Sequence, residues 1–199
     1  MTFAVEQRLD QQIRFIVELD QLKLVLRQTL LIDGSRRENT AEHSWHLATM
    51  ALTLLEYAPP ETDLLRVLKM LVLHDIVEIR AGDTFCYDAQ GNLDKAAREQ
   101  EAATYLYGLL PDDLGGEMRG LWEEFESGLT PSARFANALD RLQPLLHNYR
   151  TDGGTWRIHQ ITREQVLRRM SPIQEGAPAL WPYVLQVIDD SCTRGFILP

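Results

Sequence analysis

Cysteine is scarce in this 199-residue chain, which holds only Cys86 and Cys192. The two lie far apart and form no CxxC, so we expect neither a disulfide framework nor a cysteine-bound zinc site. Such a pattern is typical of a reducing compartment, and we expect the chain to work in the cytoplasm. The opening residues, MTFAVEQRLDQQIRF, do not join a basic segment to an apolar run, as a secretory signal would.

Long apolar runs and a positive net charge are missing as well. No stretch reaches the roughly 18–20 apolar residues that a membrane span needs, so we expect no membrane partner. The net charge is −9, which argues against binding to nucleic-acid polymers, because a phosphate backbone requires a basic surface. A small phosphorylated substrate fits this charge, because a metal ion and one or two arginines can reverse the potential locally.

Strand-like alternation of apolar and polar residues is also absent, and helix signals fill most of the chain. Asn39 followed by Glu42 makes a capping-box pattern, and Thr130 followed by Pro131 pairs an N-cap with a proline in the first turn. The almost wholly apolar segment VLKMLVL predicts a central buried helix over about residues 63–80.

These signals predict an all-α fold, a single helical bundle that spans residues 1–199. No repeat, low-complexity tract or linker divides the chain. Its composition, 45% hydrophobic and 25% charged, is that of an ordinary globular domain. We expect a motif core over about residues 20–150, with C-terminal helices in 160–195 packing on it.

The segment LHDIVEIRAGD, residues 73–83, carries the densest cluster of reactive side chains. His74, Asp75 and Glu78 have spacings that bring them to one sector of a helix, and Asp83 follows the helix end. Charges at the end of an apolar helix are costly unless they are paired or bind a metal. Taken alone, the His-Asp pair is better explained by ordinary hydrogen bonds at a helix end.

Two further residues strengthen the metal interpretation. His43 lies near the start of the preceding helix, and Asp140 lies within the apolar run ANALDRLQPLL. A carboxylate in such a run needs a partner, because burial disfavours its charge. The alternatives are a buried ion pair of Asp140 with Arg141 or Arg134, and a polar surface position for His43.

In chain order, His43, His74-Asp75 and Asp140 resemble the H…HD…D signature of the HD superfamily of metal-dependent phosphohydrolases. The segments ENTAEHS, HDIVEIRAGD and LWEEFE are similar to the oxetanocin-like branch, which contains the 5′-deoxynucleotidases and HD domain-containing protein 2. The similarity covers roughly residues 20–150. It implies an all-helical domain, one divalent metal ion, hydrolysis of nucleotide phosphomonoesters, and a homodimer.

By this resemblance, His43, His74, Asp75 and Asp140 are the metal ligands. Two imidazoles and two carboxylates suit manganese, cobalt, iron or zinc, with magnesium less favoured. Glu78 matches the catalytic glutamate of the family, which would orient or deprotonate the attacking water or protonate the leaving oxygen.

The resemblance also implies residues that bind the substrate. Asp83 matches an aspartate that contacts the sugar, and its alternative role is to cap the loop. Arg36 or Arg37 could clamp the phosphate, and Arg36 is preferred because family members carry arginine at that position. The alternative for Glu78 is a salt bridge to Arg80 or to Arg36.

One departure from the family concerns the sugar. Bacterial deoxynucleotidases carry an Arg-Trp pair before the first histidine, whereas this chain reads LRQTLLIDG, with Arg27 but no tryptophan. We therefore predict a 5′-nucleotidase for (deoxy)nucleoside monophosphates without a fixed preference for deoxyribose. Trp156 could stack on a base, although core packing is favoured. His46 is expected to pack or to support a ligand, and His147 and His159 receive no role.

Two other functions are compatible with parts of this pattern. One is a non-catalytic HD module that binds metal and nucleotide and regulates a partner, against which the intact Glu78 argues. The other is a helical scaffold without metal, in which the histidines and carboxylates only stabilise the fold.

Overall fold

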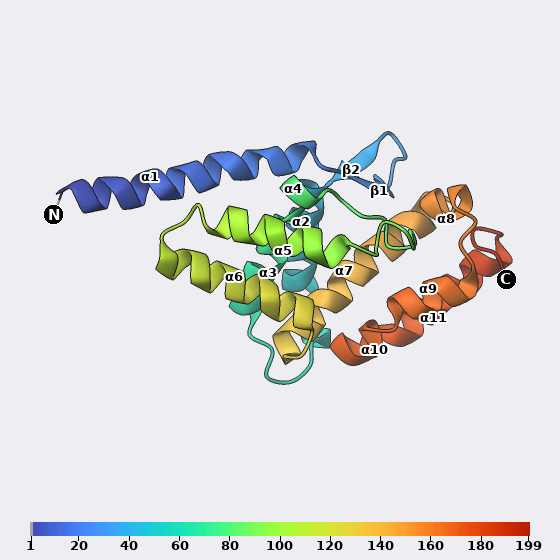
Figure 1. Cartoon of the computed structure of the whole chain (residues 1–199). Helices are drawn as coiled ribbons and strands as arrows, with labels where there is room; N and C mark the ends of the chain where they lie inside the picture. Colours follow the sequence, from blue (N-terminus) through green and yellow to red (C-terminus); the bar gives the residue numbers. More distant parts are fainter. Residues whose placement is uncertain (1) are drawn as a thin grey trace.

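The computed structural model describes residues 2–199, and it describes side chains from residue 6 onward. Helices form most of this part, which confirms the all-α expectation (Figure 1). The α-helices are α1 (Thr2–Leu19), α2 (Thr40–Leu54), α3 (Leu64–Leu73), α4 (Glu78–Ala81), α5 (Lys95–Tyr107), α6 (Asp112–Ser127), α7 (Pro131–Arg150), α8 (Gly154–Ile158), α9 (Arg163–Met170), α10 (Ile173–Gly176) and α11 (Trp181–Thr193). The described 3₁₀ helices are η1 (Asp20–Leu24), η2 (Leu55–Tyr57) and η3 (Pro178–Leu180).

A small antiparallel hairpin interrupts the helices, and the sequence patterns did not predict it. Strand β1 (Leu26–Leu30) pairs with β2 (Arg37–Asn39), with an irregular register between the ends of β1. Strands of five and three residues are too short to show a clear alternation of apolar and polar residues. The hairpin leads directly into α2, so its side chains lie beside the start of that helix.

The helix expected over residues 63–80 is broken in the structure. Helix α3 ends at Leu73, and residues 74–77 form a turn before α4. Backbone bonds three residues apart, such as Glu78 N to Asp75 O at 3.0 Å, tighten this turn. No glycine or proline lies at the break, so it could not be predicted from the sequence.

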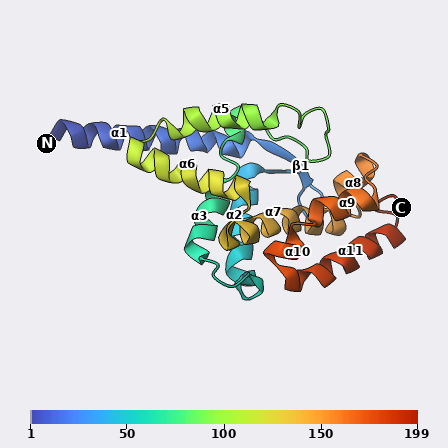
Figure 2. The same ribbon diagram turned by 60° about the horizontal axis from the view of Figure 1, so that its bottom comes forward.

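The core lies between α2, α3 and α7, and α7 runs through the middle of the molecule (Figures 1 and 2). Leu47, Met70 and Leu139 are fully buried there. The same cluster of buried residues continues into α10 and α11 through Ile173 and Ile188. The C-terminal helices therefore share their apolar contacts with the helices that precede them.

Helix α10 approaches α7 closely at Gly176. A Cβ atom at this position would lie 2.1 Å from the backbone oxygen of Arg134. Only glycine fits at this crossing, which holds the C-terminal segment against the helix that carries Asp140.

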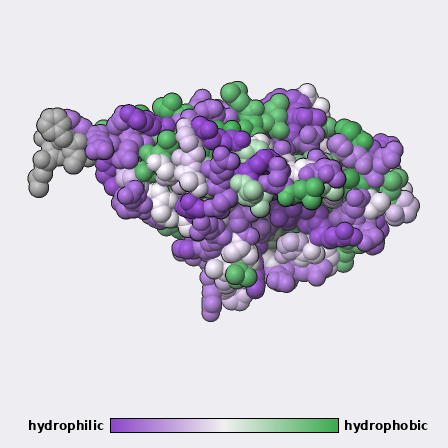
Figure 3. All heavy atoms as spheres, viewed as in Figure 1, coloured by the Kyte–Doolittle hydropathy of each residue, from purple (hydrophilic) through white to green (hydrophobic). Residues whose placement is uncertain are grey.

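Helix α1 extends away from this core, with the N terminus at its far end (Figures 1 and 2). Phe15 anchors it with 4% exposure, and Arg8 pairs with Asp113 of α6 at 2.7 Å. The face of the molecule shown in Figure 3 is mainly hydrophilic, with separate hydrophobic patches. Among residues 2–199, no helix combines the length and the apolar character that a membrane crossing requires.

Candidate active site

The chain brings the four expected ligand residues together from three places in the fold. His43 comes from the first turn of α2, His74 and Asp75 come from the turn after α3, and Asp140 comes from the middle of α7. His43, His74 and Asp140 are buried, and Asp75 keeps only 17% of its side chain exposed. A cluster assembled from such distant segments depends on how the helices pack, not on local helical spacing.

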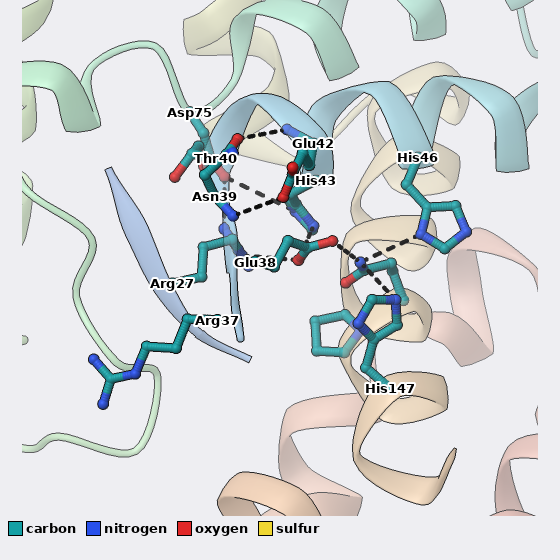
Figure 4. A network of polar contacts seen from close by, with 12 residues as sticks. Arg27, Arg37, Glu38, Asn39, Thr40, Glu42, His43, His46, Asp75 and His147 are labelled. Carbon is teal, nitrogen blue, oxygen red and sulfur yellow. Dashed lines mark hydrogen bonds and ion pairs between the residues drawn. The ribbon is translucent and has the colours of Figure 1, made fainter. Parts of the chain in front are cut away.

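The start of α2 is fixed by the capping box that the sequence predicts. The side chain of Asn39 accepts a hydrogen bond from the backbone N–H of Glu42 at 2.9 Å, and the Glu42 carboxylate accepts one from the Asn39 N–H at 3.2 Å (Figure 4). Because His43 is the next residue, this cap sets where its imidazole enters the core.

The ligand atoms converge on one point. Nε2 of His43 lies 3.0 Å from Oδ1 of Asp140 and 3.9 Å from Oδ2 of Asp75. Nε2 of His74 lies 3.0 Å from Oδ2 of Asp75 and 3.9 Å from Oδ1 of Asp140. Two imidazole nitrogens and two carboxylate oxygens thus face one another at the separations that ligands of a shared cation have.

The hydrogen bond of His74 supports a cation at this point. Its Nδ1 lies 2.9 Å from the backbone oxygen of Leu71, so in the neutral imidazole this nitrogen donates and Nε2 carries the lone pair. That Nε2 atom is buried and has no hydrogen-bond partner among the described residues. A bare, buried nitrogen beside two carboxylates fits a divalent metal ion.

The charge states of His43 and Asp140 also suit metal binding. Burial and the nearby charge of Arg27 lower the pKa of His43 to about 4, so its imidazole is neutral at pH 7. Burial acts to raise the pKa of Asp140, but the charge of Arg141 and the contact with His43 hold it well below its usual value. A neutral imidazole and an ionised carboxylate are the forms that coordinate a metal.

Glu78 lies beside the cluster without joining it. It is the first residue of α4, it is 5% exposed, and its Oε2 accepts a hydrogen bond from the Thr40 hydroxyl at 2.9 Å. Burial and the negative charge of Asp75 raise its pKa well above the ordinary value. Among the described residues, Arg80 pairs with Glu18 and Arg36 pairs with Glu42, so Glu78 forms neither of the salt bridges considered as its alternatives.

A cavity of about 160 Å³ opens onto this cluster and is lined by both acidic and basic side chains. Asp83 and Glu78 line it, as the sequence led us to expect, and burial raises the pKa of Asp83. Arg27, Arg141 and Arg169 also reach the cavity. The sequence analysis named Arg27 only for its place before the first histidine, and Arg141 only as an ion-pair partner of Asp140. Neither residue belongs to a local sequence pattern that would predict a cavity position.

Arg36 lies elsewhere in the structure. Its guanidinium forms a double contact with the Glu42 carboxylate, at 2.6 and 2.9 Å, on the exposed side of the capping box. It is not among the residues from 6 to 199 that line the cavity. Trp156 does line the cavity, and at 2% exposure it packs in the core as the favoured interpretation had it.

A second group of polar residues lies behind His43. Glu38, His46 and His147 each bring one potential ligand atom within 4.8 Å of the others. The amide nitrogen of Gln143 contacts all three. Sequence reasoning gave His147 no role and missed Glu38, because a lone acidic residue in a short strand carries no recognisable pattern.

Comparison with known proteins places this geometry in a family context. A family model described as HD domain matches residues 19–181. Among curated proteins, 5′-deoxynucleotidase HDDC2 of Danio rerio is 30% identical over 144 residues, which cover 71% of this chain and 70% of that protein. The Homo sapiens protein of the same name is 30% identical over 67% of this chain and 65% of its own length. The chain thus spans about two thirds of these relatives.

Solved structures agree with this comparison. A predicted metal-dependent phosphohydrolase from Magnetospirillum magnetotacticum is 52% identical, with a TM-score of 0.94 over 98% of this chain and 97% of that one. A conserved hypothetical protein from Pyrococcus furiosus has a TM-score of 0.65 at 24% identity, so it shares the fold.

Proposed function

The chain belongs to the HD domain family, and we propose on that basis that it is a metal-dependent phosphohydrolase that removes phosphate from nucleotides. Its most suitable substrates are (deoxy)nucleoside monophosphates, which makes it a 5′-nucleotidase. The observation that supports this most strongly is the convergence of His43, His74, Asp75 and Asp140 beside a cavity lined with arginines.

We assign these four residues as ligands of one divalent metal ion. Two nitrogens and two oxygens favour manganese, cobalt, iron or zinc over magnesium. When bound, such an ion draws charge from a phosphoryl oxygen and lowers the pKa of a coordinated water towards about 7. The chain contributes the position of the ligands and their protonation states.

Glu78 is the proposed general acid–base residue. Its carboxylate lies beside the cluster but outside it, and the Thr40 hydroxyl fixes one oxygen. The other oxygen, Oε1, can take a proton from the attacking water or return one to the leaving oxygen. The raised pKa of Glu78 lies closer to neutral pH than that of an ordinary glutamate, and a group with such a pKa both accepts and releases protons efficiently.

The arginines of the cavity are proposed to bind the anionic part of the substrate. Arg169 has no side-chain hydrogen bond or ion pair with the described residues, and Arg141 pairs only with its neighbour Asp140. A guanidinium that lines a cavity without a full set of partners fits a phosphate. Arg36 remains a predicted phosphate ligand, although it would first have to leave its pair with Glu42.

The sugar is proposed to lie near Asp83, whose carboxylate can accept a hydrogen bond from a ribose hydroxyl. Gln28 follows Arg27 and lines the cavity, whereas the bacterial deoxynucleotidases have a tryptophan next to their arginine. A polar amide at this position leaves room for a 2′-hydroxyl. We therefore propose that both ribo- and deoxyribonucleotides are substrates.

We also propose that the protein is a cytoplasmic homodimer with one domain over residues 1–199. Leu9, Ile13 and Ile16 of α1 are 49–60% exposed, and their spacing places them along one face of the helix. An apolar stripe on a projecting helix suits contact with a second copy. The mass in solution, measured by light scattering, tests this, and a monomer would contradict it.

The test of the proposed function is a phosphatase assay with added cobalt or manganese on matched ribo- and deoxyribonucleoside monophosphates. We expect release of phosphate that depends on the metal. A metal-loaded protein that binds nucleotides without turnover would instead support the regulatory module, and a protein without bound metal would support the scaffold.

A further inference from the structure

Glu38 is a buried charged residue that the proposed mechanism does not use. It is the middle residue of β2, is 2% exposed and stands five positions before His43 in the chain. The strand turns its side chain inward, towards the back of the His43 imidazole (Figure 4). A buried carboxylate needs partners, so its two oxygens indicate what it does.

The first oxygen faces two donors. Oε2 of Glu38 lies 3.6 Å from Nδ1 of His43 and 3.7 Å from Nε of Arg27. All three atoms are buried, and none has a hydrogen-bond partner among the described residues. The Nε–H of Arg27 and the Nδ1 atom of His43 therefore converge on one acceptor, within a few tenths of an ångström of hydrogen-bond distance, and no other described residue satisfies them.

The position of the proton on His43 makes this contact necessary. Its Nε2 faces Asp140 and Asp75, so binding a cation requires that this nitrogen be bare. The ring proton must then sit on Nδ1, which needs an acceptor. His74 meets the same requirement with the backbone oxygen of Leu71, whereas for His43 the described residues offer only the carboxylate of Glu38.

The second oxygen is anchored from behind. Oε1 of Glu38 accepts a hydrogen bond from the Gln143 amide at 2.6 Å, and that amide lies 3.1 Å from Nε2 of His147. Nδ1 of His147 donates to the backbone oxygen of Leu30 at 2.9 Å, so its Nε2 accepts. The chain of contacts runs from β1 through α7 to β2, and it fixes the orientation of the Glu38 carboxylate.

The residues around Gln143 could instead hold a second metal ion, because Glu38, His46 and His147 have suitable atoms. The Gln143 nitrogen already fills the space between them, at 2.6, 3.5 and 3.1 Å from the respective atoms. Both amide hydrogens have acceptors in this arrangement. The group is therefore better described as a hydrogen-bonded support than as a metal site.

We propose that Glu38 is a positioning residue for the metal centre: it holds the His43 proton on Nδ1, turns Nε2 towards the cation and keeps Arg27 against Asp75. The Arg27 guanidinium lies 2.9 Å from the Asp75 carboxylate. The Glu38 carboxylate therefore orients both the ligand His43 and the guanidinium that pairs with the ligand Asp75. This inference rests on the proposed ligand role of His43. Carboxylates behind metal-bound histidines tune affinity in the same way.

The experiment compares metal affinity in the full-length wild type, Glu38→Gln and the control Glu42→Gln. Affinity for Co²⁺ and Mn²⁺ is measured by competition with a chelator, together with the visible spectrum of the Co²⁺ protein and the melting curve of the metal-free protein. In Glu38→Gln the oxygen of the new amide still accepts the hydrogen bond from Gln143. The N–H₂ group of the new amide then faces the donors of His43 and Arg27, where the wild type has an acceptor. Glu42 caps the same helix, a role that glutamine also fills, and the contacts of its side chain are with Arg36 and Asn39 and not with the His43 imidazole.

We expect one metal per chain, about 10–100-fold weaker binding in Glu38→Gln, and a change within about twofold in Glu42→Gln. The Co²⁺ spectrum should shift in Glu38→Gln alone. Unchanged affinity in a folded Glu38→Gln protein, or an equal loss in both variants, contradicts the proposal. Two metals per chain, one of them lost in Glu38→Gln, would make Glu38 a ligand and overturn it as well.

A second measurement keeps the proposal testable if Glu38→Gln does not fold. Nitrogen-15 spectra of the Zn²⁺-loaded wild type report which nitrogen of His43 carries the proton. We expect a protected proton on Nδ1, and a proton on Nε2 would overturn the proposal. A wild type that binds one metal but hydrolyses no phosphoester would refute the proposed function alone, since the affinity comparison still decides the role of Glu38.

Discussion

Oδ1 of Asp140 lies 3.0 Å from Nε2 of His43, although the two residues are 97 positions apart in the chain. This contact joins the middle of α7 to the first turn of α2. It places an ionised carboxylate and a neutral imidazole at one point, beside the corresponding pair of His74 and Asp75.

Asp140→Ala should abolish metal binding and phosphatase activity together. The substitution removes one of the two carboxylates that face the imidazoles, and it leaves Arg141 without its ion-pair partner. Elemental analysis after gel filtration measures the metal, and circular dichroism checks the fold. Asp189→Ala is the matched control, because Asp189 pairs with Arg163 on the surface. Full metal content in the folded Asp140→Ala protein would refute the ligand assignment.

Removal of the metal should lower the melting temperature of the wild type. A ligand at a free concentration of about 100 times its Kd adds about 2.7 kcal/mol to the stability of the folded state. For a chain of this size each kcal/mol shifts the melting temperature by about 2–4 °C, so chelation should lower it by about 5–10 °C. Differential scanning calorimetry with and without chelator measures the shift. Asp140→Ala should not respond to the chelator, and equal shifts in both proteins would point to a different metal site.

Much of the fold could be predicted because helix caps are local. The side chain of Asn39 accepts a hydrogen bond from the backbone N–H of Glu42, and that of Thr130 accepts one from the N–H of Ala133, as their sequence patterns indicated. The structure confirms the all-α class, and the comparisons confirm the HD family, whose motifs ENTAEHS, HDIVEIRAGD and LWEEFE are each short segments of the sequence. The division into one domain stays a prediction.

The rest depended on contacts between distant segments. The β1–β2 hairpin escaped prediction because its strands are short, and the break after Leu73 has no glycine or proline to mark it. Glu38 and Arg169 reach the site from a strand and from α9 only after the helices pack. Helical spacing had placed His74 and Glu78 on one regular helix, whereas a tight turn in fact separates the two.

Glu78→Gln should lower kcat by about 10²–10⁴-fold, the range that general acid–base groups contribute. The amide keeps the shape and the hydrogen bond from Thr40, but it cannot accept or release a proton. Metal affinity should stay close to that of the wild type, because Glu78 lies outside the ligand cluster. Steady-state kinetics and the chelator competition measure the two effects separately. A large loss of metal would mean that Glu78 is a ligand.

The same variant should make the metal-free protein more stable at neutral pH. Burial raises the pKa of Glu78 in the folded state, so the folded protein binds this proton more tightly than the unfolded chain does. Its contribution to stability is present at low pH and is lost as the pH rises from the unfolded pKa through the folded one. Glutamine has no such proton. Melting curves of both chelated proteins should therefore diverge as the pH rises above about 4.3, the ordinary pKa of glutamate. If the two melting temperatures instead change in parallel with pH, burial does not raise the pKa of Glu78 in the folded protein.

Arg169→Ala should raise KM for nucleoside monophosphates more than Arg36→Ala does. Arg169 lines the cavity and has no partner among the described side chains, whereas Arg36 is held by Glu42 on the surface. A lost hydrogen bond to a charged group costs about 1.5–3 kcal/mol, which corresponds to an increase of about 10–100-fold in KM. Steady-state kinetics on both variants, with the metal saturating, make the comparison. A larger increase in KM for Arg36→Ala would instead assign phosphate binding to Arg36. That side chain would then have to leave Glu42 and turn towards the metal ligands when the substrate binds.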